Sequence, residues 1–310
     1  MPAAKRSRLT TILAKIETTY GTDSLPTGAN AIRVYNGSVV PLEGDEVQTQ
    51  YLQPYFGASE STQVTQYMTV SFNVPFSGVA VVGDEPGVAT LLRMCSVSVT
   101  EDTGVKHVMA PVTNDPESGT IYINVDGILH KSVGVRGNAS VDVQAKAAPG
   151  WKFDFTGAFV PLVDAPAPTG LVYTSFLKAL PVNKTHTTLT LDGVSLAAYG
   201  FSFNVGNTVS KEDLINVDSV DVSDRVSTGS VTFRTNSIAT KNWVEKARTR
   251  DKVALLLKHG QGLVNTVTIS AARAEIGKPT YGDSNGFHTT TLPLRFIPSD
   301  AGNDEWSIEI

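Results

Sequence analysis

One stretch of strict alternation, residues 68–76, restricts the fold of this chain more than any other feature of its sequence. Large apolar residues alternate there with small or polar ones: Met68, Val70, Phe72, Val74 and Phe76 against Thr69, Ser71, Asn73 and Pro75. A period of two residues is typical of a strand with one buried face. The stretch therefore predicts a long strand against a core.

The residues that follow predict a short helix. Asp84 stands where it can cap a helix after the turn at Gly83, and Pro86 is tolerated in a first helical turn. Apolar residues then recur at helical spacing: Val88, Leu91, Leu92 and Cys95. A long strand feeding a short helix is the expected unit.

The same order recurs in the second part of the chain. Val231 and Phe233 alternate with polar residues, and apolar residues at helical spacing follow within 236–250: Ile238, Trp243, Val244 and Ala247. Asn36-Gly37 and Asp192-Gly193 predict tight turns ahead of two long polar segments, 43–66 and 205–229. Preserved order suggests an internal repeat.

We therefore predict a mainly β fold made of two tandem β-sandwich or barrel domains, each with a short flanking helix. An N-terminal arm covers residues 1–30 and is expected to need a partner surface. The first domain spans 31–165, a stiff linker with Pro166 and Pro168 spans 166–186, and the second domain spans 187–310.

The charge distribution argues against a protein that grips nucleic acid. The chain has 25 Lys and Arg against 30 Asp and Glu, a net charge of −5. Residues 1–165 hold 11 basic against 16 acidic residues, which leaves 14 against 14 for 166–310. Grip on a phosphate backbone needs clustered Lys and Arg, so at most transient passage of nucleic acid is expected.

Motifs for catalysis or cofactor binding are missing from the sequence. The five histidines are scattered without metal-ligand spacing, and Cys95, the single cysteine, lies on a predicted apolar helix face where an inert buried thiol is expected. Three acids, Asp126, Asp142 and Asp154, could converge as glycosidase carboxylates, but nothing selects them over other surface acids. We expect no enzyme activity, no cofactor, no metal and no membrane segment.

Two sets of exposed residues suggest contacts with other chains. Tyr51, Tyr55 and Phe56 are aromatic residues in the long polar segment 43–66, with packing on their own domain as the alternative interpretation. Arg248 and Arg250 close the second predicted helix, where cations favour the helix C-terminus. We hypothesise that they contact the acidic first half of a neighbouring copy, so that reversing both to Glu should weaken association more than folding.

The N-terminal sequence resembles that of the major tail tube proteins of long-tailed, non-contractile bacteriophages. The resemblance lies in two runs, Ala14-Lys15-Ile16-Glu17-Thr18-Thr19-Tyr20-Gly21-Thr22 and Pro26-Thr27-Gly28-Ala29-Asn30-Ala31-Ile32, and in the order of elements. The family's tube domain is a β-sandwich that closes towards a barrel. This chain departs from the family pattern by carrying the domain apparently twice.

The resemblance implies a structural virion protein, made in the host cytoplasm, that polymerises into stacked rings. Duplication implies a homotrimer with pseudo-hexameric symmetry, although a hexamer stays open. The implied partners are other copies, a tape-measure protein, tail terminator and tail-tip proteins, and DNA passing during ejection. Segments 43–66 and 205–229 would reach the adjacent ring, residues 1–30 would add contacts between subunits, and Asp126, Asp142 and Asp154 are candidates for the lumen. Contact candidates outside segment 43–66 are Ile16, Tyr20, Leu214, Ile215, Arg248 and Arg250.

Two other functions remain open from the sequence. A baseplate or tail-tip protein could carry the same fold. A carbohydrate-binding or glycan-cleaving β-protein would instead be a monomer with an aromatic cleft and two essential acids, and the absence of a secretory signal in the sequence argues against it.

Overall fold

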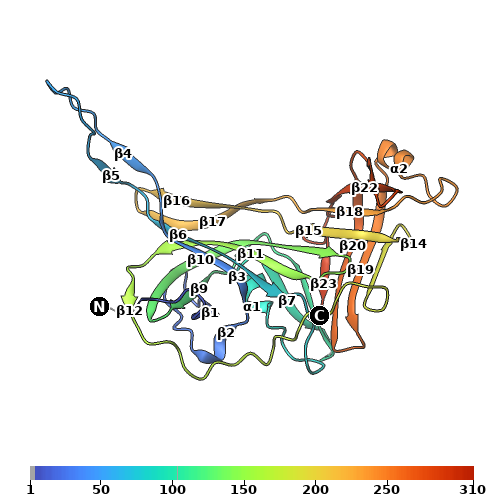
Figure 1. Ribbon diagram of the computed structural model, residues 1–310, viewed down its shortest axis with the longest axis horizontal. Helices are drawn as coiled ribbons and strands as arrows, with labels where there is room; N and C mark the ends of the chain where they lie inside the picture. The colour runs from blue at the N-terminus through green and yellow to red at the C-terminus, as the bar shows by residue number, and fades with distance from the viewer. Residues whose placement is uncertain (1–3, 103) are drawn as a thin grey trace.

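The computed structural model describes residues 4–102 and 104–310, and it is mainly β with two short α-helices (Figure 1). The first half contains β1 (Thr10–Ile16), η1 (Gly28–Asn30), β2 (Ala31–Ile32), β3 (Tyr35–Glu43), β4 (Glu46–Gln48), β5 (Ser61–Gln63), β6 (Tyr67–Pro75), α1 (Ala89–Arg93), β7 (Val97–Asp102), β8 (Lys106–Pro111), β9 (Gly119–Val125), β10 (Ile128–Gln144), β11 (Gly150–Phe159) and β12 (Val163–Asp164). Residues 165–186 then run without a helix or strand.

The second half begins at residue 187 and holds the remaining elements. These are β13 (Thr187–Leu191), β14 (Val194–Ser195), β15 (Ala198–Asn204), β16 (Asn207–Leu214), β17 (Val217–Arg225), β18 (Thr228–Arg234), α2 (Trp243–Thr249), β19 (Lys252–Gln261), β20 (Asn265–Ile276), β21 (Thr280–Ser284), β22 (Phe287–Phe296) and β23 (Ser307–Glu309).

The alternating strand predicted from the sequence is β6, at the centre of the first core. Its apolar residues are buried and its polar residues lie on the other face. β6 pairs with β11 in register, with Phe72 opposite Phe153 and Val70 opposite Phe155. The Phe72 ring lies 6.1 Å from Phe153 and 5.7 Å from Phe155, distances at which aromatic rings attract one another. The prediction of a half-buried strand is confirmed.

The two halves repeat one order of strand pairing. Neighbouring strands run β1, β9, β10, β11, β6, β3 in the first half and β13, β19, β20, β22, β18, β15 in the second. Each half also has a two-stranded excursion, β4–β5 or β16–β17, before the strand that leads to its helix. The order of elements read from the sequence is therefore present in the strand pairing as well.

Two glycines fix the equivalence of the excursions. Gly44 and Gly206 have positive φ angles of 148° and 79°. A Cβ at Gly44 would lie 1.9 Å from the Thr65 carbonyl oxygen, and one at Gly206 would lie 2.0 Å from that of Val226. Only glycine fits such a close approach. Gly44 therefore corresponds to Gly206, and Thr65 to Val226.

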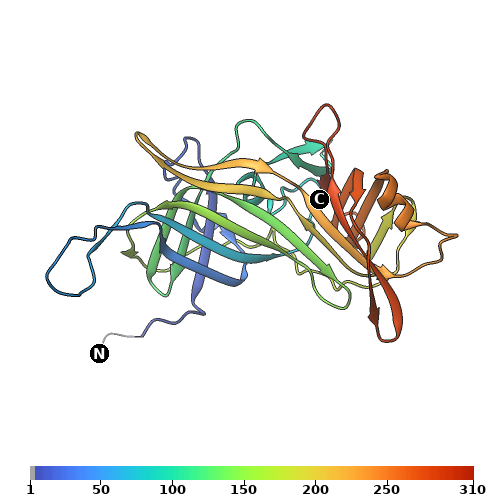
Figure 2. The same cartoon turned by 90° about the horizontal axis from the view of Figure 1, so that it is seen from above.

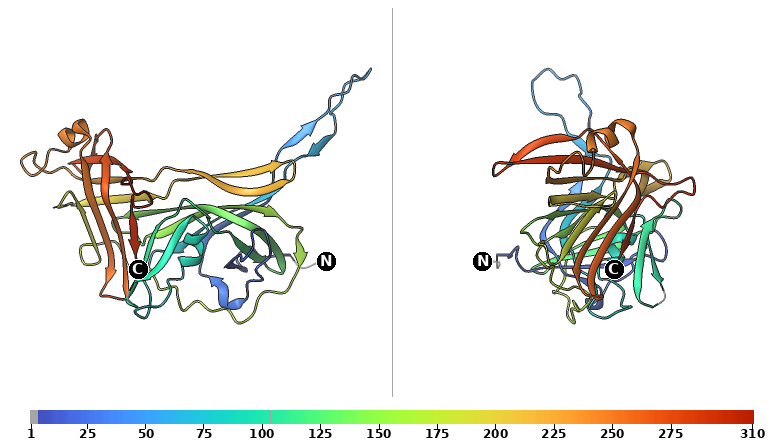
Figure 3. Two further views of the ribbon diagram at one scale, coloured as in Figure 1. Left: turned by 180° about the vertical axis from the view of Figure 1, so that it is seen from behind. Right: turned by 90° about the vertical axis from the view of Figure 1, so that its right-hand side faces the viewer.

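Antiparallel pairing joins the halves directly. β10 pairs with β15 from Ser140 opposite Asn204 to Gln144 opposite Gly200. At the other side, the C-terminal strand β23 lies between β8 and β20. One sheet therefore runs through both halves, and the β4–β5 excursion projects clear of the body at the end farthest from β19 and β20 (Figures 1 and 3).

Several sequence expectations need correction. The N-terminal arm over 1–30 does not hold from residue 10, because β1 pairs with β9 and buries Ile12, Leu13 and Ala14; residues 1–3 lie outside the described part. Asn36-Gly37 makes no hairpin turn, because β3 continues through it with a shift in its register against β6.

The helices and the polar segments also differ from the expectation. α2 begins at Trp243, which leaves Ile238 exposed outside it, and α1 begins only at Ala89. The first half has the additional β7–β8 hairpin between α1 and β9, whereas β19 follows α2 directly in the second half. Segment 205–229 is held on the first half of its own chain at Asn207 and Val220, and its contact with an adjacent ring stays a prediction.

Candidate assembly surfaces

The sheet that crosses the two halves has one polar face, called here the polar face. It carries the side chains that alternate with the buried ones on β6, β11, β10, β15, β18 and β22. Small hydroxyl and amide groups pair across the strands, as between Asn138 and Asn204 at 2.8 Å and between Thr232 and Thr291 at 2.8 Å. Such pairs satisfy polar groups inside the face.

Two of the three candidate lumen acids lie on the polar face. Asp154 on β11 accepts from Ser71 at 2.7 Å and pairs with Lys152 at 2.9 Å. Asp142 lies on β10 and accepts from Gln144 at 2.7 Å. Asp126 is elsewhere, in the β9–β10 turn, where its carboxylate accepts from the Arg6 backbone at 2.8 Å. The structure therefore places Asp142 and Asp154 on the same face of the sheet, four residues apart in register, and Asp126 elsewhere.

The sheet has a free edge in each half. β3 pairs with β6 and β21 pairs with β22, and neither has a second neighbour among residues 4–102 and 104–310. β21 is largely exposed, and β3 exposes Val40 and Leu42. Unpaired edges present rows of N–H and C=O groups that favour pairing with another chain. These edges are the first candidate for contacts between copies.

The two edges have counterparts that already pair inside the chain. The equivalence of Thr65 with Val226 places Tyr67 at Thr228 and makes β3 the counterpart of β15. Ser71 then corresponds to Thr232, so their partners Asp154 and Thr291 also correspond. The residue opposite Asp154 on β10 is Asn138, and the residue opposite Thr291 on β21 is Thr280. β21 thus corresponds to the second part of β10. The β10–β15 pair is therefore an internal example of a contact that β21 and β3 of two copies could make.

Residues 44–66, called here the arm, form the second candidate surface. Its strands share a ladder from Glu46 opposite Gln63 to Gln48 opposite Ser61. The tip beyond this ladder exposes large apolar side chains: Tyr51, Leu52, Tyr55 and Phe56. A cluster of exposed aromatic residues on a projecting loop is typical of an interaction site.

Residues 206–227, called here the hairpin, lie across the first half of their own chain (Figures 1 and 2). Val220 is fully buried, and Arg136 on β10 donates to the Val220 carbonyl at 2.8 Å and to Asp221 at 2.6 Å. The Tyr20 hydroxyl accepts from the Val220 backbone at 2.5 Å. Burial raises the pKa of Tyr20, so this hydroxyl stays neutral. Tyr20, a predicted contact between subunits, thus also fixes the hairpin within the chain.

The start of the hairpin is fixed by Asn207. Its side-chain amide donates to the Cys95 carbonyl at 2.6 Å and to the Gly137 carbonyl at 3.0 Å. Its backbone N–H donates to the Asn138 side chain at 3.0 Å. At the far end, Leu214 and Ile215 form an exposed apolar tip. The base of the hairpin is therefore fixed, while its tip is available for contacts.

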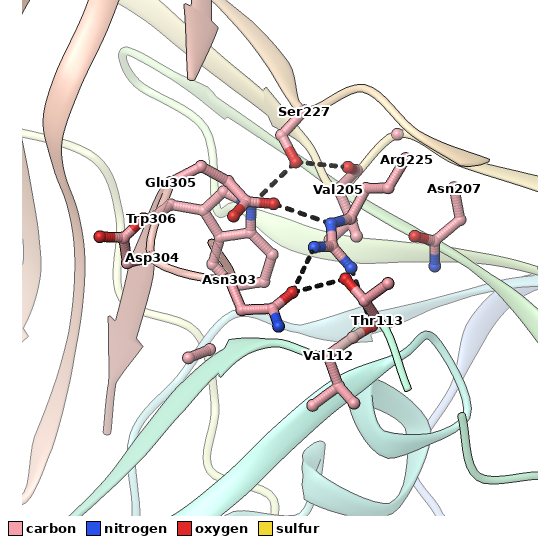
Figure 4. Close-up of polar contacts among 12 residues, drawn as sticks. Val112, Thr113, Val205, Asn207, Arg225, Ser227, Asn303, Asp304, Glu305 and Trp306 are labelled. Carbon is pink, nitrogen blue, oxygen red and sulfur yellow. Dashed lines mark hydrogen bonds and ion pairs between the residues drawn. The ribbon is translucent and has the colours of Figure 1, made fainter. Parts of the chain in front are cut away.

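A buried ion pair fixes the second strand of the hairpin, β17, to the C-terminal segment (Figure 4). Arg225 donates to Glu305 at 2.8 Å, to the Val112 carbonyl at 2.9 Å and to Asn303 at 3.1 Å. Beside it, the Trp306 indole donates to the Ser227 hydroxyl at 2.9 Å. These contacts link the hairpin, the C-terminal segment and the end of β8, and we call them the Arg225 clamp.

The end of α2 carries the basic residues noted in the sequence. Arg248 forms a 2.5 Å ion pair with Glu245 within the helix. Arg250 reaches Glu275 at 3.3 Å, and Lys252 pairs with the same carboxylate. The hydrogen bond from Lys252 holds the pKa of Glu275 below its usual value. Both arginines are more than half exposed, so their guanidinium groups can also reach another molecule.

The contact candidates fall into separate places in the fold. Ile16 ends β1 and packs against the core, and Tyr20 lies under the hairpin. Tyr51, Tyr55 and Phe56 form the tip of the arm, and Leu214 and Ile215 form the tip of the hairpin. None of the sequence arguments pointed to Arg136, Asn207 or Arg225. No motif or spacing marks any of the three in the sequence, and only Gly206 beside Asn207 could have indicated a special turn.

Metal and thiol chemistry find no support in the described part of the chain. Residues 4–102 and 104–310 hold no group of three or more His, Cys, Asp or Glu that could bind a metal. Cys95 is fully buried, and burial raises the pKa of its thiol well above the usual value, as expected of an inert cysteine. Among the described helices, none has the length and apolar character of a membrane span.

Comparison with known families tests the interpretations of the sequence. The family model described as "Phage tail tube protein" matches residues 7–295. The chain belongs to the phage tail tube protein family. It is accordingly a structural protein of a phage tail, in a family whose members assemble with themselves and with other tail components. The search of curated proteins found no match.

The solved structures similar to this tail tube family member include one of a baseplate. It is the "Cryo-EM structure of the anti-feeding prophage (AFP) baseplate, 6-fold symmetrised". The similarity covers 39% of this chain and 94% of that chain, with 14% sequence identity and a TM-score of 0.28. A similarity this low carries no argument about function.

Proposed function

We propose that three copies of this protein close into a ring with pseudo-six-fold symmetry, and that stacked rings form a tail tube through which DNA passes. The observation that supports this proposal is the pair of free edges, β3 and β21, at the two ends of one sheet. Their counterparts β15 and β10 pair within the chain. A head-to-tail contact of this kind closes into a ring when the rotation between copies allows it.

Family membership supports the choice of a tube over other ring proteins. In a closed ring the polar face would line the channel, because it is the face opposite the buried core. Outside the Arg136–Asp221 ion pair it carries Lys152, Arg234 and Arg295 against Asp142 and Asp154, an excess of one positive charge. Without a cluster of Lys and Arg, such a lining would hold the DNA backbone only weakly and would let it slide. The tape-measure protein, tail terminator and tail-tip proteins are the further partners we propose.

The equivalent positions also predict which residues face each other at the contact. Ser140 pairs with Asn204. Gly282 corresponds to Ser140, because it follows Thr280 as Ser140 follows Asn138. Glu43 is opposite Tyr67 as Asn204 is opposite Thr228. We therefore expect Gly282 of one copy to face Glu43 of the next.

A pair of matched variants tests this contact. Gly282→Glu places two carboxylates opposite each other, whereas Gly282→Lys places an ammonium opposite Glu43; a directly opposed pair is worth up to about 1 kcal/mol. Gly282→Glu should raise the concentration needed for assembly several-fold, and Gly282→Lys should not. Negative-stain microscopy and light scattering measure assembly, and unfolding curves check that both variants fold equally well.

The outcome also separates the tube from the other candidate functions. Rings or hollow filaments of the wild-type protein, weakened by Gly282→Glu and restored by adding Glu43→Lys, would support the proposal. A monomer at all concentrations would contradict it. If the concentration needed for assembly is unchanged by both substitutions, the strand edges are not the contact between copies.

A further inference from the structure

We propose that the arm of one copy lies across the second half of the neighbouring copy in the same ring, at the site equivalent to the one the hairpin occupies on the first half. This inference rests on the proposed function, because it needs copies joined through β3 and β21. It differs from contact with an adjacent ring, which is the role that the resemblance implied for the arm.

The course of the chain indicates where the arm would lie. The hairpin leaves β15, which pairs with β10, and immediately crosses β10 and β11. The arm leaves β3, the counterpart of β15, in the same way. When β3 pairs with β21 of a neighbour, the base of the arm reaches β21 and β22 of that neighbour. The hairpin then shows where the arm lies.

Equivalent positions in the two halves indicate which residues of neighbouring copies would be in contact. Asn207 follows Gly206 and bonds the carbonyl of Cys95, and Cys95 directly precedes Ser96, a residue with φ of 58° after helix α1. In the second half, Arg250 has φ of 58° after helix α2 and directly follows Thr249. Asp45 follows Gly44 and corresponds to Asn207. Asp45 of one copy therefore meets Thr249 of the next.

Charge complementarity supports the same site. The arm and its base carry acids at Glu43, Asp45, Glu46 and Glu60, and the sequence has no Lys or Arg from residue 34 to residue 92. An aspartate at a helix C-terminus is repelled by the helix dipole unless a cation lies beside it. Arg250 is that cation, because its bonds to Glu275 at 3.3 Å and to the Ile276 carbonyl at 3.5 Å are long for a charged donor.

The arm lacks an equivalent of the Arg225 ion pair that fixes the hairpin on its own chain. Arg225 precedes Val226 and anchors the hairpin through Glu305. The residue at the same place in the arm, one before Thr65, is Val64, which is exposed and has no charge to anchor. The isolated chain therefore holds the hairpin firmly, whereas the direction of the arm is set by the surface it meets.

Disulfide trapping tests this contact. The double variant Asp45→Cys with Thr249→Cys should form intermolecular disulfides when assembled protein is oxidised, giving covalent trimers on a non-reducing gel. The matched control combines Asp45→Cys with Leu263→Cys, a fully exposed residue in the β19–β20 turn of the same half, and should give only background cross-linking. Buried Cys95 is present in both variants.

A charge swap gives a second readout. Arg250→Glu should raise the concentration needed for assembly several-fold, and Asp45→Arg added to it should restore wild-type assembly. Trapping above the control, together with rescue, would support the inference. Wild-type rings without specific trapping, or assembly insensitive to Arg250→Glu, would overturn it and leave the ring proposal standing. Absence of any wild-type ring or filament would overturn both.

Discussion

Removing the Arg225 guanidinium should destabilise the protein more than removing an exposed guanidinium, because Arg225 and Glu305 form a buried ion pair. Arg225 and Glu305 have side-chain exposures of 12% and 7%, so the pair is largely desolvated. In Arg225→Met, Glu305 would remain buried without its cation, and its second carboxylate oxygen has no hydrogen-bond partner in the described chain. Breaking a buried pair in this way costs about 3–5 kcal/mol.

The partner substitution should cost less. Glu305→Gln keeps the shape and leaves Arg225 its bonds to Val112 and Asn303. It loses one charged hydrogen bond, worth about 1.5–3 kcal/mol. In the double variant no unpaired carboxylate is left, so its loss of stability should be well below the sum of the single losses.

Urea unfolding followed by tryptophan fluorescence measures these energies, since Trp306 lies within the clamp. Arg93→Met is the matched control, because its 2.5 Å pair with Glu117 is about one-third exposed and should contribute about 1 kcal/mol or less. An Arg225→Met cost no larger than that of the control, or additive losses in the double variant, would refute the reasoning.

Three further predictions concern pH, the hairpin turn and the arm. Burial, with His186 nearby, lowers the pKa of His259 to about 4, so the unfolded chain binds a proton more readily than the folded chain. The free energy of unfolding should therefore fall by about 3 kcal/mol between pH 6.5 and pH 4. His259→Gln should flatten that pH dependence in urea titrations. Gly206→Ala should lower the free energy of unfolding by more than about 2 kcal/mol. Gly193→Ala, also at positive φ but with nothing within 4 Å of the added Cβ, should lower it by about 1 kcal/mol. Equal shifts of the melting temperature in the two variants would show that the close approach at Gly206 is not costly. Phe56→Ser should leave the melting temperature unchanged and weaken assembly, and light scattering that equals wild type would exclude the arm tip from the interface.

Local periodicity was sufficient to predict the central strand and the repeated order of elements. β6 has one apolar and one polar face, and a period of two residues records exactly that environment in the sequence. The Asp192-Gly193 turn was predicted correctly for a similar reason, because it joins the short strands β13 and β14. These features depend on residues close together in the chain.

Features that depend on distant partners were not predictable from the sequence. Asn36-Gly37 has the composition of a hairpin turn, but pairing with β6 keeps the chain extended there. Residues 10–16 were predicted as part of the N-terminal arm, because nothing near them in the sequence indicates their pairing partner β9, which lies more than 100 residues away. The contact of Arg136 with the hairpin and the contact of Arg225, within the hairpin, with Val112 join the two halves, and no spacing along the chain indicates them.

The candidate site was predicted in part. Aromatic residues in a long polar segment indicated the exposed tip of the arm, because they had no apolar periodicity that would place them in a core. Asp142 and Asp154 share a face because β10 and β11 pair in register, whereas Asp126 belongs to a turn. An acid's sequence position alone does not reveal this difference.

A cryo-EM reconstruction of the assembled protein tests the central claim most directly. The account predicts three chains per ring, with β3 of each chain paired antiparallel to β21 of the next and Gly282 facing Glu43. Six chains per ring, or a ring in which the β3 and β21 edges face solvent, would contradict it.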